Sequence, residues 1–137
     1  MEEVSGNETI LVVDDEITVL SLAHTMLERH GYNVIDASSA VEALHLFEVW
    51  PELQIDLALI DIVMTGMDGF ELAERLREMR PRLAVVYMSA YTEKEDARPA
   101  STGDVPFLAK PFTAQQLAGK VRAVLDSPRK KTASGPF

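Results

Sequence analysis

Cysteine is absent from this chain of 137 residues, and so are long apolar runs. Without cysteine, disulfide frameworks and thiolate metal sites are excluded. No apolar stretch approaches the roughly 20 residues that a membrane-spanning helix needs. The first residues, MEEVSGNE, are acidic where a signal peptide would be basic. We therefore expect a cytoplasmic protein with no membrane insertion.

Basic residues are also scarce. The chain has 13 lysines and arginines against 22 aspartates and glutamates, which gives a formal net charge of -9. A negative protein repels the phosphate backbone of DNA or RNA. We therefore expect no direct nucleic-acid binding.

The length suits one domain with its own hydrophobic core. Residues 1–8 are polar, and residues 127–137, SPRKKTASGPF, combine Pro, Gly and Ser with a basic triplet and show no apolar periodicity. Such composition is typical of chain ends that do not pack. We expect an N-terminal tail at 1–8, a domain at 9–126 and a flexible C-terminal tail at 127–137.

Within the domain, short apolar runs alternate with amphipathic stretches. Continuous apolar runs are typical of strands that are covered on both faces in a parallel sheet, whereas apolar residues three and four apart predict helices. A T-x-x-Q capping box at Thr113 and Gln116 predicts the start of a last helix. The expected strands are 10–13, 32–37, 57–60, 83–88 and 105–109, and the helices before the last are 19–30, 41–50 and 70–79.

The connection between the fourth and fifth strands is different. Its residues 93–104, EKEDARPASTGD, include Pro99 and Gly103 and almost no large apolar side chain. A fourth helix there should be short or irregular. The alternation as a whole still predicts an α/β protein with an open parallel sheet and helices on both faces.

Chemically useful residues stand at the ends of four strands. They are Asp14 and Asp15, Asp61, Ser89, and Lys110. The carboxyl ends of parallel strands meet at one edge of the sheet, where such proteins place their sites. Each residue alone could be a helix cap, a turn residue or a surface charge. Their expected convergence predicts a functional site.

The composition of this site indicates its chemistry. Three carboxylates and one ammonium leave a surplus of about two negative charges, which favours a bound cation. With oxygen ligands only, Mg²⁺ is expected, and Mn²⁺ could substitute for it. A metal, a lysine and a hydroxyl beside a carboxylate suit phosphoryl transfer to that carboxylate. Asp61 is therefore the candidate phosphate acceptor.

The motifs LVVDDE, LIDIVMTGMDG, VVYMSAYTE and PFLAKPFT, in this order, resemble the receiver domains of two-component response regulators over 9–126. The resemblance implies a flavodoxin-like (βα)5 three-layer sandwich whose parallel strands have the order 2-1-3-4-5. It implies that a histidine kinase or a histidine phosphotransfer protein delivers a phosphoryl group to Asp61 in a phosphorelay. Such a domain is a signalling module that catalyses only its own phosphorylation and autodephosphorylation.

The resemblance also implies a set of site residues. Asp14, Asp15, Asp61 and the backbone carbonyl of Val63 would bind the metal. Lys110 would pair with the phosphate, and the Lys110–Pro111 peptide bond would be cis.

Two switch residues and two rate-tuning residues are implied as well. Ser89 would hydrogen-bond the phosphoryl oxygen in the active state, and Phe107 would be the aromatic switch residue. Val63 and Tyr91, which flank the approach to Asp61, are candidates for tuning the rate of phosphoryl loss.

Three departures from the family pattern stand out. Thr65 replaces the usual proline after the acceptor, which predicts a more flexible loop. Phe107 stands where tyrosine is common, and the interruption near Pro99 falls on a helix that receivers commonly use to signal. The interruption near Pro99, together with VPFLAKPFT, is most similar to receivers fused to hybrid histidine kinases, although a free-standing receiver fits equally.

The sequence predicts no particular downstream partner for the signal. We expect a monomer or weak dimer.

Other function classes fit less well. An aspartate-nucleophile phosphatase would carry D-x-D after the first strand, where this chain has adjacent Asp14 and Asp15. A flavin-binding module would need a phosphate-cradling loop of Ser, Thr and Gly there. An inactive scaffold would not need the complete set of five residues. No role is assigned to His24, His30 or His45, which lie on expected helices.

Overall fold

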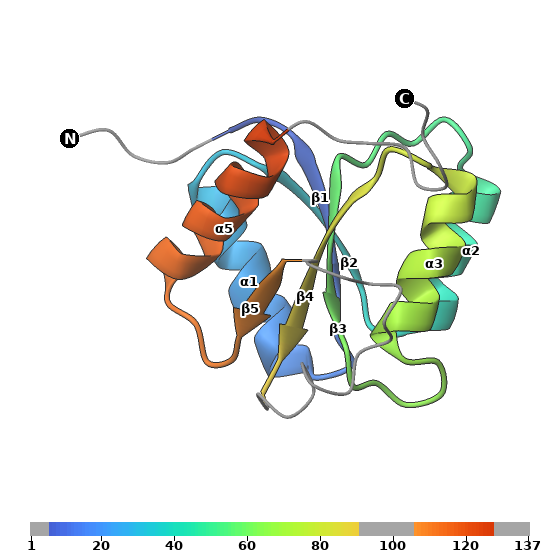
Figure 1. Cartoon of the computed structure of the whole chain (residues 1–137), viewed down its shortest axis with the longest axis horizontal. Helices are drawn as coiled ribbons and strands as arrows, with labels where there is room; N and C mark the ends of the chain where they lie inside the picture. Colours follow the sequence, from blue (N-terminus) through green and yellow to red (C-terminus); the bar gives the residue numbers. More distant parts are fainter. Residues whose placement is uncertain (1–5, 91–105, 128–137) are drawn as a thin grey trace.

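The computed structural model describes residues 6–90 and 106–127 (Figure 1). In this part of the chain, strands and helices alternate as the apolar pattern predicts. Their order is β1 (Thr9–Val13), α1 (Ile17–Arg29), β2 (Asn33–Ala37), α2 (Ala40–Val49), β3 (Leu57–Asp61), α3 (Gly69–Met79), β4 (Ala84–Ser89), β5 (Phe107–Ala109) and α5 (Ala114–Asp126).

The strands form one parallel sheet of five strands in the order β2-β1-β3-β4-β5, which confirms the predicted fold. The register places Val13 beside Ile60, and Asp61 beside Met88. All strands point the same way, so their carboxyl ends lie together at the lower edge of the view in Figure 1. This edge carries the residues predicted to form the site.

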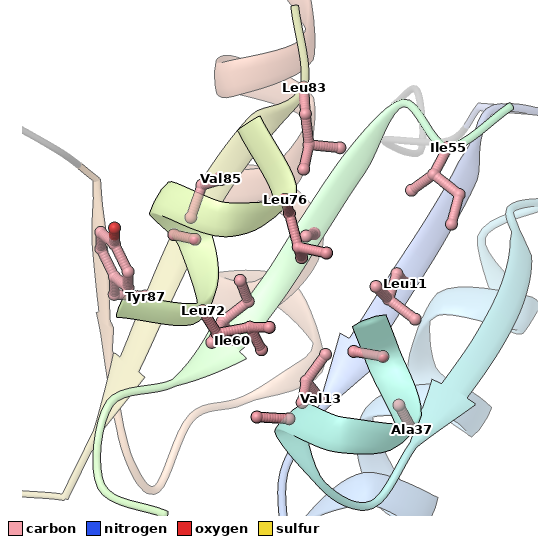
Figure 2. Packing of buried hydrophobic residues seen from close by; sticks show 14 of the residues in the cluster. Leu11, Val13, Ala37, Ile55, Ile60, Leu72, Leu76, Leu83, Val85 and Tyr87 are labelled. Carbon is pink, nitrogen blue, oxygen red and sulfur yellow. The ribbon is translucent and has the colours of Figure 1, made fainter. Parts of the chain in front are cut away.

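The two faces of the sheet bury two separate cores, because side chains alternate along a strand. From β1, Leu11 and Val13 enter one core, while Ile10 and Val12 enter the other. β1, β3 and β4 are almost fully buried, which explains why their sequences read as continuous apolar runs. Figure 2 shows Leu72 and Leu76 of α3 packed on the first core.

Helices cover both faces, which gives three layers. α2 and α3 pack on the face that carries Leu11 and Val13, and α1 and α5 pack on the opposite face (Figure 1). Buried apolar residues at three- and four-residue spacing supply the contacts of α1 and α5. They are Leu20, Ala23, Leu27, Leu117, Val121 and Leu125.

Local signals fix the helix ends. Thr113 and Gln116 form the predicted capping box at the start of α5. Ser39 and Asp68 cap α2 and α3 by accepting hydrogen bonds from backbone N–H groups. α1 ends at the predicted glycine, because Gly31 has φ of 94° and the N–H groups of Gly31 and Tyr32 turn back to the last carbonyls of the helix.

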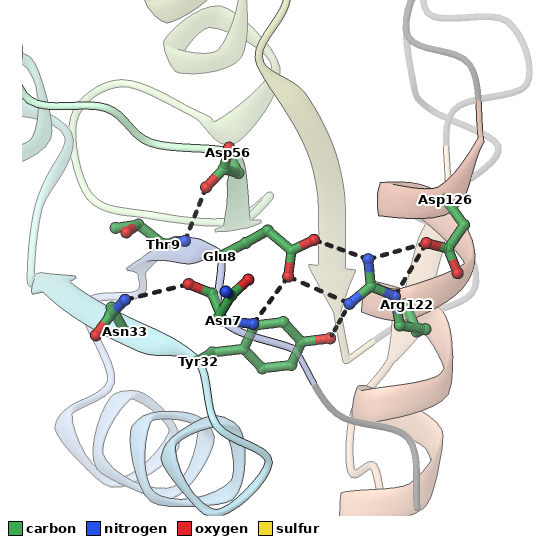
Figure 3. Close-up of polar contacts among 8 residues, drawn as sticks. All are labelled: Asn7, Glu8, Thr9, Tyr32, Asn33, Asp56, Arg122 and Asp126. Carbon is green, nitrogen blue, oxygen red and sulfur yellow. Dashed lines mark hydrogen bonds and ion pairs between the residues drawn. The ribbon is translucent and has the colours of Figure 1, made fainter.

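A polar network joins the segment before β1 to α5 (Figure 3). Arg122 binds Glu8 through two nitrogens, at 2.8 and 3.2 Å, and also contacts Asp126 and the hydroxyl of Tyr32. The N–H of Gly6 donates to the carbonyl of His30 at 3.0 Å. These contacts bind residues 6–8 to the domain, although the sequence placed them in the tail.

The element bounds differ from the expected ones by one or two residues. The fourth strand runs over 84–89 rather than 83–88, and the third includes Asp61. The expected short fourth helix, Tyr91 and the tail beyond residue 127 lie outside the described residues. None of the helices in residues 6–90 and 106–127 has both the length and the apolar character of a membrane span.

Candidate functional site

Backbone hydrogen bonds between strands align the residues of the site. Asp14 follows β1, Asp61 and Ser89 are the last residues of β3 and β4, and Lys110 follows β5. The N–H of Lys110 donates to the carbonyl of Ser89 at 2.9 Å, and the N–H of Ile62 donates to the carbonyl of Met88 at 2.9 Å. Backbone hydrogen bonds thus continue past the last paired residues of the strands and hold the residues of the site in register.

The ammonium of Lys110 lies at the centre of the site. Its Nζ is 2.9 Å from Oδ2 of Asp14, 3.2 Å from Oδ1 of Asp61 and 3.1 Å from Oε1 of Glu16. Asp14 and Asp61 are buried, as is most of the Lys110 side chain, whereas Glu16 is exposed. A buried ion pair of this kind needs several partners to offset its desolvation. The convergence predicted from parallel topology is therefore present.

Asp14, Asp15 and Asp61 form an acidic cluster. Each offers a carboxylate oxygen, and these oxygens lie within 4.8 Å of one another. Asp14 and Asp61 are buried, and Asp15 is exposed. Oδ2 of Asp14 makes no hydrogen bond of good geometry, and its ion pair with Lys110 is the contact that compensates its burial.

The electrostatics of the cluster act on Asp61. Burial and the neighbouring charge of Asp14 raise the pKa of Asp61 to about 6, and Lys110 opposes this rise. Burial alone would lower the pKa of Lys110, but its close contact with Asp14 and the charge of Asp61 raise it above its usual value. Lys110 is therefore positively charged, and the cluster around it carries more negative than positive charge.

These residues fit a hard divalent cation. The donors are all carboxylate oxygens, which Mg²⁺ prefers, and the chain has no cysteine to favour a softer metal. Burial and the negative charge of Asp14 disfavour the ionised form of Asp61 and raise its pKa, although Lys110 lies 3.2 Å away. A cation bound by Asp14, Asp15 and Asp61 would favour that ionised form.

The loop after β3 makes a second tie to the cluster. The N–H of Thr65 donates to Oδ2 of Asp15 at 3.0 Å. Proline has no N–H and could not make this bond. The departure from the usual proline at position 65 therefore provides a hydrogen-bond donor for Asp15. The greater loop flexibility expected from Thr65 stays a prediction.

Gly69 allows α3 to approach the end of β3 closely. Its N–H donates to the carbonyl of Ile62 at 2.9 Å. A Cβ at this position would collide with the backbone oxygen of Asp61 and come within 2.9 Å of Cα of Ile62. The first turn of α3 and the end of β3 can pack this tightly only because residue 69 has no side chain.

The remaining predicted site residues lie around this centre. Ser89 is buried beside it, and the Lys110–Pro111 peptide bond is cis, as the resemblance implied. The side chain of Val63 is exposed. Phe107 is partly buried, with its ring 6.0 Å from that of Tyr87. Tyr91 lies outside the described residues.

Two contacts of the site were not predicted. Glu16 follows the two aspartates directly in the motif LVVDDE, and its charge was the available signal for a contact with Lys110. Nothing in the sequence indicated the hydrogen bond from the Thr65 backbone to Asp15. Both depend on side-chain and loop conformations, which strand patterns do not determine.

Comparison of the sequence with known proteins identifies relatives of this chain. A family model described as the response regulator receiver domain matches residues 10–122. The sensor kinase CckA of Brucella abortus is 38% identical over 128 residues, which cover 90% of this chain and 13% of the kinase. The chain spans about half the length of several other curated relatives that it matches.

Solved structures agree in fold. A CheY-like receiver domain protein from Methanospirillum hungatei has a TM-score of 0.77 and 30% identity, over 88% of this chain and 95% of that one. The response regulator TrrA of Thermotoga maritima, solved in complex with Mg(2+)-BeF, has a TM-score of 0.74 and 29% identity, over 85% of this chain and 98% of that one.

Proposed function

The chain belongs to the response regulator receiver domains, and we propose that it accepts a phosphoryl group on Asp61 in a Mg²⁺-dependent reaction. The observation that carries this proposal is the buried contact of Asp61 with Lys110, which also binds Asp14. This contact brings three groups together at the carboxyl ends of the strands: the acceptor carboxylate of Asp61, the ammonium that would bind the phosphate, and a carboxylate that would bind the metal.

In the proposed reaction, an oxygen of the Asp61 carboxylate attacks the phosphorus of a phosphohistidine. The new P–O bond forms as the P–N bond breaks, and the imidazole nitrogen leaves with the electron pair of that bond. The ammonium of Lys110 is 3.2 Å from Oδ1 of Asp61, so it is close enough to stabilise the negative charge that develops on the phosphoryl oxygens. Ser89, at the end of the neighbouring strand, would donate its hydroxyl to a phosphoryl oxygen.

Asp14, Asp15, Asp61 and the backbone carbonyl of Val63 would hold Mg²⁺, for which Mn²⁺ could substitute. When bound, the ion supplies positive charge to the phosphoryl oxygens. The carboxylate cluster supports this assignment. The related TrrA, whose structure was solved in complex with Mg(2+)-BeF, supports it as well.

Phosphorylation would change the surface through Ser89 and Phe107. The ring of Phe107 packs beside Tyr87, which in turn lies 4.8 Å from Phe70, so a movement of Phe107 would alter an aromatic row at the edge of one core. We assign Val63 and Tyr91 to the tuning of phosphoryl loss. Autodephosphorylation belongs to this proposal, together with autophosphorylation from small donors.

The proposed phosphoryl donor is a histidine kinase or a histidine phosphotransfer protein in the cytoplasm. The sequence similarity to the sensor kinase CckA, 38% identity over 128 residues, supports a receiver of the hybrid-kinase type. A free-standing receiver stays an alternative. We propose that the domain spans 9–126, with β1 beginning at Thr9 and α5 ending at Asp126. A monomer or weak dimer is proposed.

Incubation with acetyl phosphate, followed by intact-mass spectrometry, tests the acceptor chemistry. We expect one phosphoryl group to be gained with Mg²⁺ and none with EDTA. The Asp61→Asn variant should gain none. Asp68→Asn is the matched control, because asparagine caps a helix as well as aspartate does and should leave the gain intact. A gain that persists in Asp61→Asn, or its absence from the wild type, would contradict the proposal.

A further inference from the structure

Glu16 is the third acidic partner of Lys110, and the phosphoryl chemistry proposed above gives it no role. Its Oε1 lies 3.1 Å from Nζ, a distance similar to those of Asp14 and Asp61. An ammonium group has three N–H donors and no acceptor. In the structure, three carboxylates surround these donors, and among the three it is Glu16 whose contact with Nζ has the geometry of a hydrogen bond.

A phosphoryl group on Asp61 adds oxygens that also need Lys110. Because three carboxylates already lie within 3.2 Å of the ammonium, the phosphoryl oxygens have to compete with them for its three donors. Asp14 and Asp61 are buried. If either lost its contact with Lys110, water could not hydrate its carboxylate, and a buried charge without a partner is costly. The side chain of Glu16 is 63% exposed, and water can hydrate its carboxylate once it is released.

The backbone around Glu16 allows this release. Its N–H donates to Oδ1 of Asp14 at 2.9 Å, which fixes the start of α1 independently of the side chain. Glu16 is also the N-cap residue of α1, yet its side chain makes no capping hydrogen bond. Its carboxylate can therefore turn away from Lys110 while the helix start stays in place.

We propose that Glu16 is a displaceable partner of Lys110 that holds the ammonium before phosphorylation and is released when a phosphoryl group occupies Asp61. Glu16 is thus a positioning residue, and its pairing with Lys110 opposes phosphoryl binding. This inference rests on the proposed phosphoryl-acceptor function of Asp61.

Beryllofluoride, which mimics a phosphoryl group, provides the test. Its dissociation constant in the presence of Mg²⁺ would be measured by titration calorimetry for the wild type, Glu16→Gln and Glu16→Asp. The aspartate variant keeps the charge but shortens its reach toward Lys110. Glu48→Gln, at an exposed position near the far end of α2, controls for net charge. Unfolding free energies of the unliganded variants would be measured in parallel.

We expect both Glu16 variants to bind beryllofluoride about two- to fivefold more tightly than the wild type, the range that corresponds to an exposed ion pair. Their phosphoryl group should be lost more slowly by a similar factor. Glu48→Gln should bind like the wild type. A purely structural role would change the unfolding free energy and leave the dissociation constant unchanged.

The outcomes separate this inference from the function on which it rests. Unchanged or weaker binding in the Glu16 variants of a receiver whose wild type binds beryllofluoride would overturn the role of Glu16 alone. Equal tightening in Glu48→Gln, or tightening in Glu16→Gln but not in Glu16→Asp, would assign the effect to net charge and overturn it too. A wild type that binds no beryllofluoride would overturn both proposals.

Discussion

Arg122 of α5 and Glu8, the residue before β1, form a two-point ion pair across 114 positions of sequence. Less than a third of each side chain is exposed, and Asp126 and Tyr32 complete the contacts of the guanidinium (Figure 3). The pair lies at the opposite end of β1 from the acidic cluster. It therefore contributes to stability without touching the proposed site.

Replacing Arg122 with Gln should destabilise the domain by about 1–2 kcal/mol, because a two-point, partly buried pair is stronger than an exposed one. Urea unfolding measures this change. Arg75→Gln is the matched control, since Arg75 pairs with Glu71 on the exposed face of α3 and should cost at most about 0.5 kcal/mol. Equal losses in the two variants would contradict the interpretation.

The same pair predicts a dependence on pH. The hydrogen bond from Arg122 lowers the pKa of Glu8 below its ordinary value of 4.5. Its contribution to stability is therefore complete above pH 4.5 and is lost as the pH falls through the lower, folded-state pKa. The stability difference between wild type and Arg122→Gln should shrink over that acidic range.

His24 should titrate above the ordinary histidine value of 6.5. A hydrogen bond to Asp36 at 2.8 Å raises its pKa, and Glu28 at 3.1 Å adds to the effect. Because the folded-state pKa is the higher one, the added stability is complete below pH 6.5 and is lost as the pH rises through the raised pKa. NMR titration of the imidazole measures this shift, and Asp36→Asn should move the pKa back toward 6.5. An unchanged pKa in that variant would be inconsistent with the contact.

Asp61→Asn should stabilise the metal-free protein at pH 7. A rise in pKa from 3.8 to about 6 corresponds to about 3 kcal/mol against the ionised carboxylate. Since the amide is also buried and Lys110 loses one partner, we expect a gain on the order of 1–2 kcal/mol. Thermal unfolding should show the gain above pH 6 and its decline toward pH 4, as wild-type Asp61 becomes protonated.

Mg²⁺ supplies the complementary measurement. It should raise the melting temperature of the wild type more than that of Asp61→Asn, because a ligand stabilises the folded state more when it binds that state more tightly. Equal stabilisation of both proteins by Mg²⁺ would show that Asp61 does not bind the metal.

Gly69→Ala should disturb the proposed site. The added methyl group would meet the backbone of Asp61 and Ile62, so we expect a loss of about 1–3 kcal/mol and slower phosphorylation by acetyl phosphate. Gly119→Ala is the control, because a Cβ at that position in α5 meets no atom within 4 Å. It should stabilise the domain by roughly 0.5–1 kcal/mol and leave phosphorylation unchanged. An alanine at 69 that affects neither property would contradict this explanation.

Much of the fold could be predicted because its determinants are local. Apolar runs such as Ile10 to Val13 predicted buried parallel strands, and parallel strands necessarily bring their carboxyl ends to one edge. The contacts among Asp14, Asp61 and Lys110 follow from that geometry. Strand and helix bounds were less accurate, since a residue such as Ser89 continues a strand through backbone pairing that its side chain does not signal.

Contacts that depend on side-chain conformation could not be predicted. The pair between Glu8 and Arg122 joins the segment before β1 to the last helix, and neither residue is distinctive in its local sequence. The same holds for the donation from Thr65 to Asp15, which depends on the path of the loop. Glu16 was visible beside the two aspartates, but only the structure places its carboxylate on Lys110.

Chemical trapping of the phosphorylated residue tests the central claim most directly. After reaction with acetyl phosphate and Mg²⁺, borohydride reduction converts an aspartyl phosphate into homoserine, and tandem mass spectrometry locates the modified position. We predict homoserine at position 61, dependent on Mg²⁺ and on the phosphoryl donor. Homoserine at another aspartate, such as Asp14 or Asp15, or at no position, would contradict the assignment of Asp61 as the phosphoryl acceptor.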